Sequence, residues 1–388
     1  MPERITTSGP TARQLSGQLP GQGWFLSVLA RRTYRVDLRS GRCRLAAEQL
    51  PLQEKVLLNS KTEETLADAD LVHWKPLSDI VVRGHVRVRS SARETLAGVR
   101  LGTHRKQIVA FGARRAALSN LGRVLFSDPE PFTEIPLSFE FAYGGRDEVA
   151  EKVRGIPGAF VPTSFLPPGT THRDLSPFVY PRNPAGRGFL IDASPEAVEA
   201  LNLPQLEDSE DRLTPERLPA GDPLRWPEMP VAQSLGWMSI SWFPRMGYLG
   251  VVPMHHPPRQ PLVEVTRGWA PKHIAAEPVF PPRIDMRAAN GASLGLQVPY
   301  LRGDEEGQLQ NLCADGELVR FRLPSDIPRI WTDGREGKMN ETKPVIHTVI
   351  IEPDESRISI VWRGNAPALR PYTKDELEKM PLRIEWPL

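Results

Sequence analysis

DLVHWKPLSDIVVRGHVRVR, residues Asp70–Arg89, is the stretch of sequence that decides the fold. From Ile80 to Arg89 the side chains divide at every second position into two sets: Ile80, Val82, Gly84, Val86 and Val88 form one, and Val81, Arg83, His85, Arg87 and Arg89 form the other. Because successive side chains of a strand point to opposite faces, this pattern predicts one half-buried β-strand with a basic outer face. The residues before Ile80 predict a turn-rich lead-in.

Alternating segments of the same kind recur toward both ends of the chain. They cover residues 24–38, 98–101, 107–112, 131–143, 294–301, 309–313, 317–323, 344–352 and 356–363. The chain also has 40 prolines among 388 residues, about twice the usual share, which limits helices. We therefore expect a mainly β protein of antiparallel, sandwich-like sheets, with a long Pro-rich irregular middle and few short helices.

The domain organisation follows from where the regular segments lie. We expect a flexible N-terminal lead over residues 1–22 and a single large β-rich domain over 23–365, with an irregular insertion at about 146–290. Residues 366–388 are expected to form a C-terminal tail with a short helix, because Thr373 and Glu376 form a capping-box pattern. A second short helix is expected after Ser194, with Pro195 at its first position. The strands of 23–145 and 290–365 are expected to pair in one sheet system.

The bulk composition bounds the function. Lysine and arginine total 49 and aspartate and glutamate total 47, so the net charge of +2 provides no overall field for nucleic acid or an anionic membrane. No apolar run approaches the roughly 20 residues of a membrane span, and the first residues carry no apolar signal segment. Cys43 and Cys313 fit two free thiols of a cytoplasmic protein. We expect a cytoplasmic protein without nucleic-acid or membrane partners.

Candidate functional residues fall into a partner-binding class. Arginine suits the bidentate binding of carboxylates, and tryptophan is common at the centres of protein interfaces. The candidates are Arg83, Arg87 and Arg89 on the predicted strand, Arg182 and Arg187 in the Pro/Gly loop 180–189, and Trp237 and Trp242. The eight histidines are scattered, and the adjacent pair His255-His256 on a Pro-rich loop fits zinc poorly. We therefore predict no catalytic, metal or cofactor site.

One alternative is an enzyme. Asp70 and Asp79 flank Trp74, and two carboxylates beside a stacking aromatic ring are typical of a carbohydrate-active hydrolase. The competing interpretation is structural, because aspartates in turns more often accept hydrogen bonds from backbone N–H groups. The sequence favours this structural interpretation.

A set of motifs in a fixed order carries a family resemblance. These are D-L-V-x-x-K-P-x-x-D-I-x-V-x-G from Asp70, K-x-x-x-x-F-G-x-R from Lys106, P-F-x-x-I-P-L-x-F-E-x-A-Y-G-G from Pro131, N-P-x-G-R-G-F from Asn183, L-P-x-L-E from Leu203, W-x-P-R from Trp242 and W-R-G from Trp362. Together, over residues 23–365, they resemble the uncharacterised-domain family of type VI secretion accessory proteins. The match is looser over residues 236–282, and His347 stands where an acidic residue is expected.

The resemblance implies a function without catalysis. It implies an adaptor or chaperone that binds a toxic secreted effector and helps load it onto the spike and PAAR-tip proteins. It assigns no functional residues, and it places Asp70, Lys75 and Asp79 in a framework pattern that is expected to hold the turn before the strand. A structural component of the secretion apparatus is the second alternative.

Overall fold

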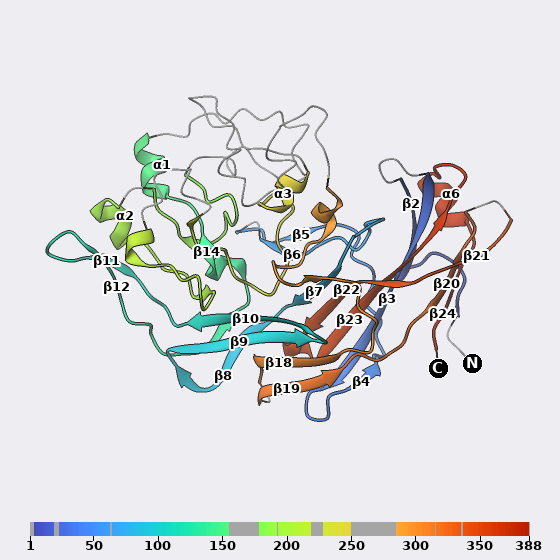
Figure 1. The fold of residues 1–388 in the computed structure, drawn as a ribbon, viewed down its shortest axis with the longest axis horizontal. Coiled ribbons are helices and arrows are strands. Elements are labelled where there is room, and N and C mark those ends of the chain that lie inside the picture. Colours follow the sequence, from blue (N-terminus) through green and yellow to red (C-terminus); the bar gives the residue numbers. More distant parts are fainter. Residues whose placement is uncertain are drawn as a thin grey trace.

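The computed structural model describes residues 4–18, 23–62, 64–154, 178–191, 193–218, 228–249, 285–314, 316–334 and 337–387. Over these residues the protein is mainly β, with several sheets of mostly antiparallel strands and short helices (Figure 1), as the sequence predicted. No helix in these ranges is long and apolar enough to cross a membrane. The His255-His256 pair and much of the predicted insertion lie outside the described residues.

The largest sheet has seven strands and joins the two ends of the chain. Its order is β17 (Gln297–Val298), β7 (Ser78–Val82), β22 (Val345–Glu352), β23 (Arg357–Pro367), β3 (Trp24–Asp37) and β2 (Ala12–Gln18), with β4 (Arg42–Leu45) paired to the far end of β3. Strands β7 and β22 run parallel, and the other pairs are antiparallel. The predicted pairing of the two terminal regions in one sheet system is confirmed.

A second sheet of five antiparallel strands packs its apolar side chains into the same core. Its order is β16 (Leu206–Glu207), β10 (His104–Phe111), β9 (Glu94–Leu101), β18 (Glu306–Cys313) and β19 (Gly316–Arg322). Val99, Ile108 and Leu309 of this sheet share one buried cluster with Val28 and Val349 of the larger sheet. The two sheets therefore form a sandwich-like arrangement, which places the outer face of the smaller sheet toward solvent.

The opening stretch contains two strands, where the sequence predicted one. All five residues of β7 are buried, and β8 (His85–Ala92) pairs with β13 (Phe132–Pro136) in another sheet. The break falls at Gly84, whose φ is +151°, a backbone conformation that glycine adopts at little cost. The prediction of a single half-buried strand was wrong, because alternation continues across a bend that glycine permits.

Both chain ends contribute strands that the sequence missed. Strand β2 lies within the expected N-terminal lead and pairs with β3 at every one of its seven positions. Strand β24 (Leu382–Glu385) lies within the expected tail and pairs with β1 (Arg4–Ile5) and β20 (Arg329–Thr332). These segments are too polar or too short to show a clear apolar pattern, and their partners lie far away in the sequence. Strand β21 (Asn340–Thr342) completes this sheet beside β20.

The remaining elements are short. The strand pairs are β11 (Ala116–Leu118) with β12 (Val124–Phe126), β14 (Tyr143–Gly144) with β15 (Arg187–Gly188), and β5 (Leu57–Leu58) with β6 (Thr65–Ala67). Within the described ranges the α-helices are α1 (Glu148–Arg154), α2 (Pro195–Glu199), α3 (Arg245–Tyr248) and α6 (Lys374–Lys379), and the 3-10 helices are Phe139–Phe141, Pro215–Arg217, Met286–Ala289 and Pro353–Glu355. Both predicted helix starts are confirmed: Ser194 accepts a hydrogen bond from the N–H of Ala197, and Thr373 forms a capping box with Glu376.

Candidate partner-binding groove

The outer face of the five-stranded sheet carries polar and charged side chains in register. On β9, Ala97, Val99 and Leu101 are buried in the core, whereas the intervening Gly98 and Arg100 belong to the outer face. The cross-strand pairs place these residues in two rows that run across the sheet. One row is Arg105, Arg100, Gln308 and Arg320, and the other is Gln107, Gly98, Gln310 and Leu318.

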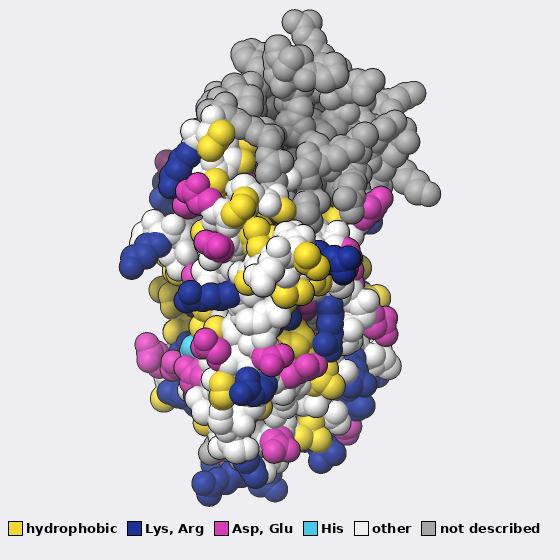
Figure 2. Space-filling model, turned by 90° about the vertical axis from the view of Figure 1, so that its left-hand side faces the viewer, with side chains coloured by type: hydrophobic (Ala, Val, Ile, Leu, Met, Phe, Trp, Pro, Cys, Tyr) yellow, Lys and Arg dark blue, Asp and Glu magenta, His cyan; other side chains and the backbone are white. Residues whose placement is uncertain are grey.

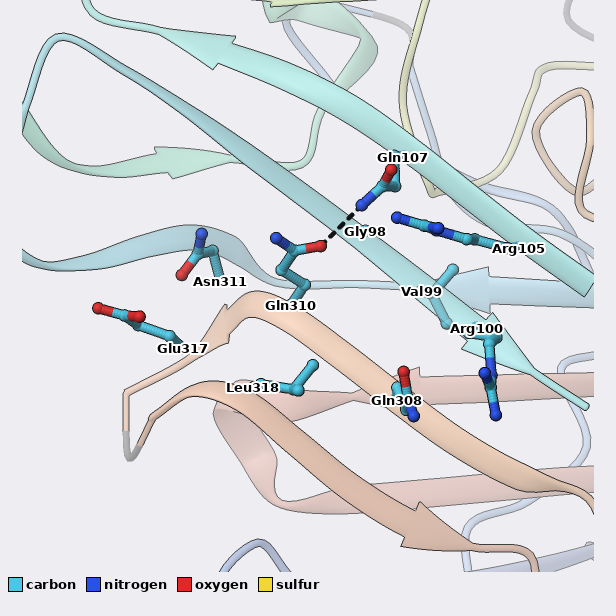
Figure 3. A pocket seen from close by; sticks show the side chains of 10 residues that line it. All are labelled: Gly98, Val99, Arg100, Arg105, Gln107, Gln308, Gln310, Asn311, Glu317 and Leu318. Atoms are coloured by element: carbon cyan, nitrogen blue, oxygen red, sulfur yellow. Dashed lines mark hydrogen bonds between the residues drawn. The ribbon is translucent and has the colours of Figure 1, made fainter.

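Gly98 creates a hollow in the middle of this face. The space above it is about 360 Å³ and is lined from four strands (Figure 3). Because Gly98 has no side chain, the amide of Gln107 reaches across β9 and donates a hydrogen bond to Oε1 of Gln310 at 2.7 Å. A Cβ atom at position 98 would lie 2.5 Å from the backbone oxygen of Lys106, so a larger residue there would disturb the sheet.

A second hollow, of about 340 Å³, adjoins the first. It is lined by β8, by β13 and by the turn between β18 and β19, through residues Arg87, Val88, Arg89, Thr133, Glu134, Cys313, Ala314 and Glu317. Glu317 also lines the hollow at Gly98, so the two hollows share this residue. We call the two together the groove.

The groove is basic. Its described lining residues include four arginines, namely Arg87, Arg89, Arg100 and Arg105, and two glutamates, Glu134 and Glu317, so the net charge of these described residues is +2. Figure 2 shows acidic and basic side chains mixed over most of the described surface, with basic ones gathered at the lower end. In Figure 1 that end carries β19 and the turn between β3 and β4.

Three arginines of the sheet face are unpaired. Within the part of the chain that the structure describes, the side chains of Arg100, Arg105 and Arg320 form no ion pair and no hydrogen bond, and Nε of Arg100 is buried without a partner. Arg100 and Arg105 are direct neighbours across β9 and β10, an arrangement of like charges that destabilises a sheet. None of these three arginines was among the candidates that the sequence indicated.

A lysine lies beneath the groove on the opposite face of β10. Nζ of Lys106 donates hydrogen bonds to Oγ of Ser293 at 2.9 Å and to the backbone oxygen of Leu294 at 2.7 Å. Burial lowers the pKa of Lys106 to about 7, against a weaker opposing effect of Asp208. Lys106 therefore anchors β10 to the loop before β17 and takes no direct part in the groove.

The structure separates the three arginines that the sequence grouped on one strand. Arg87 and Arg89 line the groove, where Arg87 pairs with Asp354 at 2.9 Å and with Glu134. Arg83 precedes Gly84, directly after β7, and pairs with Glu352 of β22 at 3.3 Å. Arg83 therefore does not line either hollow.

Arg182 and Arg187 belong to a tight turn. In this turn the fully buried Asn183 donates hydrogen bonds to the backbone oxygens of Phe139 and Tyr143. Arg187 donates a hydrogen bond to the backbone oxygen of Glu140 at 2.8 Å. The side chain of Arg182 forms a hydrogen bond with Tyr180, and burial lowers the pKa of Arg182. Both arginines thus stabilise the turn, away from the groove.

The two candidate tryptophans lie in the interior. Trp237 is 3% exposed and Trp242 is 4% exposed, so in this conformation they are core side chains and not surface anchors. Another tryptophan, Trp331 on β20, is partly exposed between the guanidinium groups of Arg329 and Arg383, which lie 4.6 and 4.5 Å from its ring centroid. No sequence pattern distinguished Trp331 from the buried tryptophans.

The predicted framework of the opening stretch is observed. Asp79 is fully buried and accepts hydrogen bonds from Nζ of Lys75 at 2.7 Å, from the Asn290 amide at 3.0 Å and from the Gly291 N–H at 3.0 Å. Asp70 is also buried, accepts from the N–H of Gln53 and pairs with Arg31; burial raises the pKa of its carboxyl. Both carboxylates are engaged inside the protein, an arrangement that gives no support to a hydrolase site at Trp74.

Comparisons with known proteins identify one family. A family model described as "Uncharacterized protein conserved in bacteria (DUF2169)" matches residues 22–363, which is most of the chain. No curated protein and no solved structure matches the chain. Among the described residues, no group of three or more histidine, cysteine, aspartate or glutamate side chains is arranged to hold a metal ion.

Proposed function

The chain belongs to the DUF2169 family of bacterial proteins. From its motifs and its surface, we propose that it is an effector adaptor of type VI secretion. It binds a toxic effector in the cytoplasm and helps to load it onto the spike and PAAR tip. The ordered motifs described above support this proposal through their resemblance to secretion accessory proteins. The function consists of protein binding without catalysis.

The groove is the observation that carries the proposal. Its side chains include arginines and amides at the surface of a sheet, and such groups bind a protein partner by hydrogen bonds and ion pairs. The sheet is anchored from below by the buried contacts of Lys106, so the groove is formed before a partner arrives. A preformed surface of this kind lowers the entropic cost of binding.

The test is reconstitution with the proteins encoded beside the gene. We expect the purified chain to co-elute in size-exclusion chromatography with the neighbouring effector, alone or together with the spike and tip proteins. Charge reversal in the groove, as Arg87→Glu with Arg89→Glu, should weaken this complex. The matched control is Arg44→Glu, because Arg44 is an exposed arginine of β4 outside the groove.

Two results would contradict the proposal. The first is the absence of a stable complex with effector, spike or tip protein. The second is a ring or filament formed by the chain alone in light scattering, which would indicate a structural component of the secretion apparatus.

A further inference from the structure

We infer that the groove binds an extended, acidic segment of the protein partner, whose carboxylates are held by Arg100 and Arg105 of the groove and by Arg320, which lies in the same row of the sheet beside it. The inference rests on the proposed function and adds the chemistry of the segment that is bound. It starts from the three arginines, which have no ion pair or hydrogen bond among the described residues although they lie in one row across the sheet.

The charge arrangement indicates an anionic ligand. Arg100 lies opposite Arg105 on one side and opposite Gln308 on the other, and Arg320 lies opposite Gln308. Two unpaired guanidinium groups on directly opposed residues repel each other, and a carboxylate bound between them would relieve this repulsion. Arginine is also suited to bind a carboxylate through two parallel hydrogen bonds.

The dimensions indicate an extended peptide. The row of Arg105, Arg100, Gln308 and Arg320 crosses from β10 to β19, which is three strand spacings, or about 14 Å. An extended chain rises about 3.3 Å per residue, so about four or five residues span the row. The amides of Gln107 and Gln310 lie in the neighbouring row and can bond to the backbone groups of such a segment.

The lining favours a peptide over a nucleic acid. Among the residues that the structure describes, those that line the two hollows include no phenylalanine, tyrosine or tryptophan, and binding of single-stranded nucleic acid depends on such rings for base stacking. Glu134 and Glu317 within the groove would also repel phosphates. Separate carboxylates, spaced by uncharged residues, can avoid these two glutamates.

The inference is tested with a defined probe and the full-length protein. The probe is a fluorescein-labelled ten-residue peptide that alternates glutamate and serine, and its control has glutamine in place of glutamate. We expect salt-sensitive binding of the acidic peptide in fluorescence anisotropy, and binding at least about tenfold weaker for the glutamine peptide and for Arg100→Gln with Arg105→Gln. Arg44→Gln is the matched control and should bind as the wild type does.

Three outcomes would overturn the inference: no binding of the acidic peptide, equal binding by the Arg100→Gln, Arg105→Gln variant, or tighter binding of a single-stranded oligonucleotide than of the peptide. The circular dichroism spectrum of the glutamine variant must match that of the wild type, and its melting temperature must be no lower. Arg100→Lys with Arg105→Lys should restore part of the binding. Co-elution of this glutamine variant with the effector separates the two proposals. A variant that keeps the effector complex refutes the acidic segment alone, whereas a wild-type chain that forms no complex refutes the adaptor function.

Discussion

Replacement of Asp79 by alanine tests whether this carboxylate belongs to the framework or to an active site. Asp79 is fully buried beside Lys75, which is 1% exposed, and their charged atoms are 2.7 Å apart. Asp79→Ala leaves the ammonium group of Lys75 buried without its counter-charge and also removes the acceptor of the Asn290 amide and the Gly291 N–H. Loss of one partner of a buried ion pair costs about 3–5 kcal/mol, so the free energy of unfolding should fall by that amount.

The assay is urea unfolding followed by tryptophan fluorescence, with the free energy taken from the midpoint and slope. The matched control is Glu341→Ala, which breaks the exposed pair with Arg329, whose side chain is 61% exposed. An exposed pair contributes about 1 kcal/mol or less. Lys75→Met combined with Asp79→Leu should lose less stability than the two single changes added together, by about 0.5–3 kcal/mol.

The reasoning would be refuted by a loss of less than about 1 kcal/mol for Asp79→Ala. That result would show that Lys75 and Asp79 are solvated in solution, and it would reopen the hydrolase interpretation of Asp70, Trp74 and Asp79. A loss of the expected size supports the framework role that the buried contacts indicate.

Three further predictions concern the groove and the chain end. Between about pH 7 and pH 10.5 Lys106 is protonated in the unfolded protein but neutral in the folded protein, so the free energy of unfolding rises with pH in this range. This rise is at most about 1.4 kcal/mol per pH unit. Lys106→Met should abolish it, as measured by urea unfolding at several pH values. Gly98→Ala should cost about 1–3 kcal/mol through its contact with the oxygen of Lys106, whereas Gly23→Ala, with open space around its Cβ, should leave the melting temperature unchanged. Thr373→Ala removes the capping box with Glu376 and should lower the stability of α6 by about 1 kcal/mol. Amide hydrogen exchange should then be faster in α6 and unchanged in β9.

The sequence alone determined the class of fold and several local features. Alternation, turn residues and caps act between neighbours in the chain, so they reveal the hairpin of β9 with β10, the hairpin of β22 with β23, and the starts of α2 and α6. The Pro/Gly pattern of residues 180–189 also indicated a tight turn, and in the structure Gly188 takes a positive φ of +95° in that turn. The framework role of Asp79 followed from its place in a motif.

The tertiary structure alone decided which surfaces are exposed and which residues meet. Alternation does not say what covers the second face of a strand, so β7 was expected to be half-buried, although neighbouring elements bury all five of its residues. The same limit made Trp237 and Trp242 candidates for the surface when they belong to the core. Arg100, Arg105 and Arg320 lie in one row because β18 pairs with β9 on one side and with β19 on the other, which brings the β9–β10 hairpin and β19 into one sheet. Pairing between strands about 200 residues apart depends on register and on a shared core, and the local pattern of side chains determines neither of them.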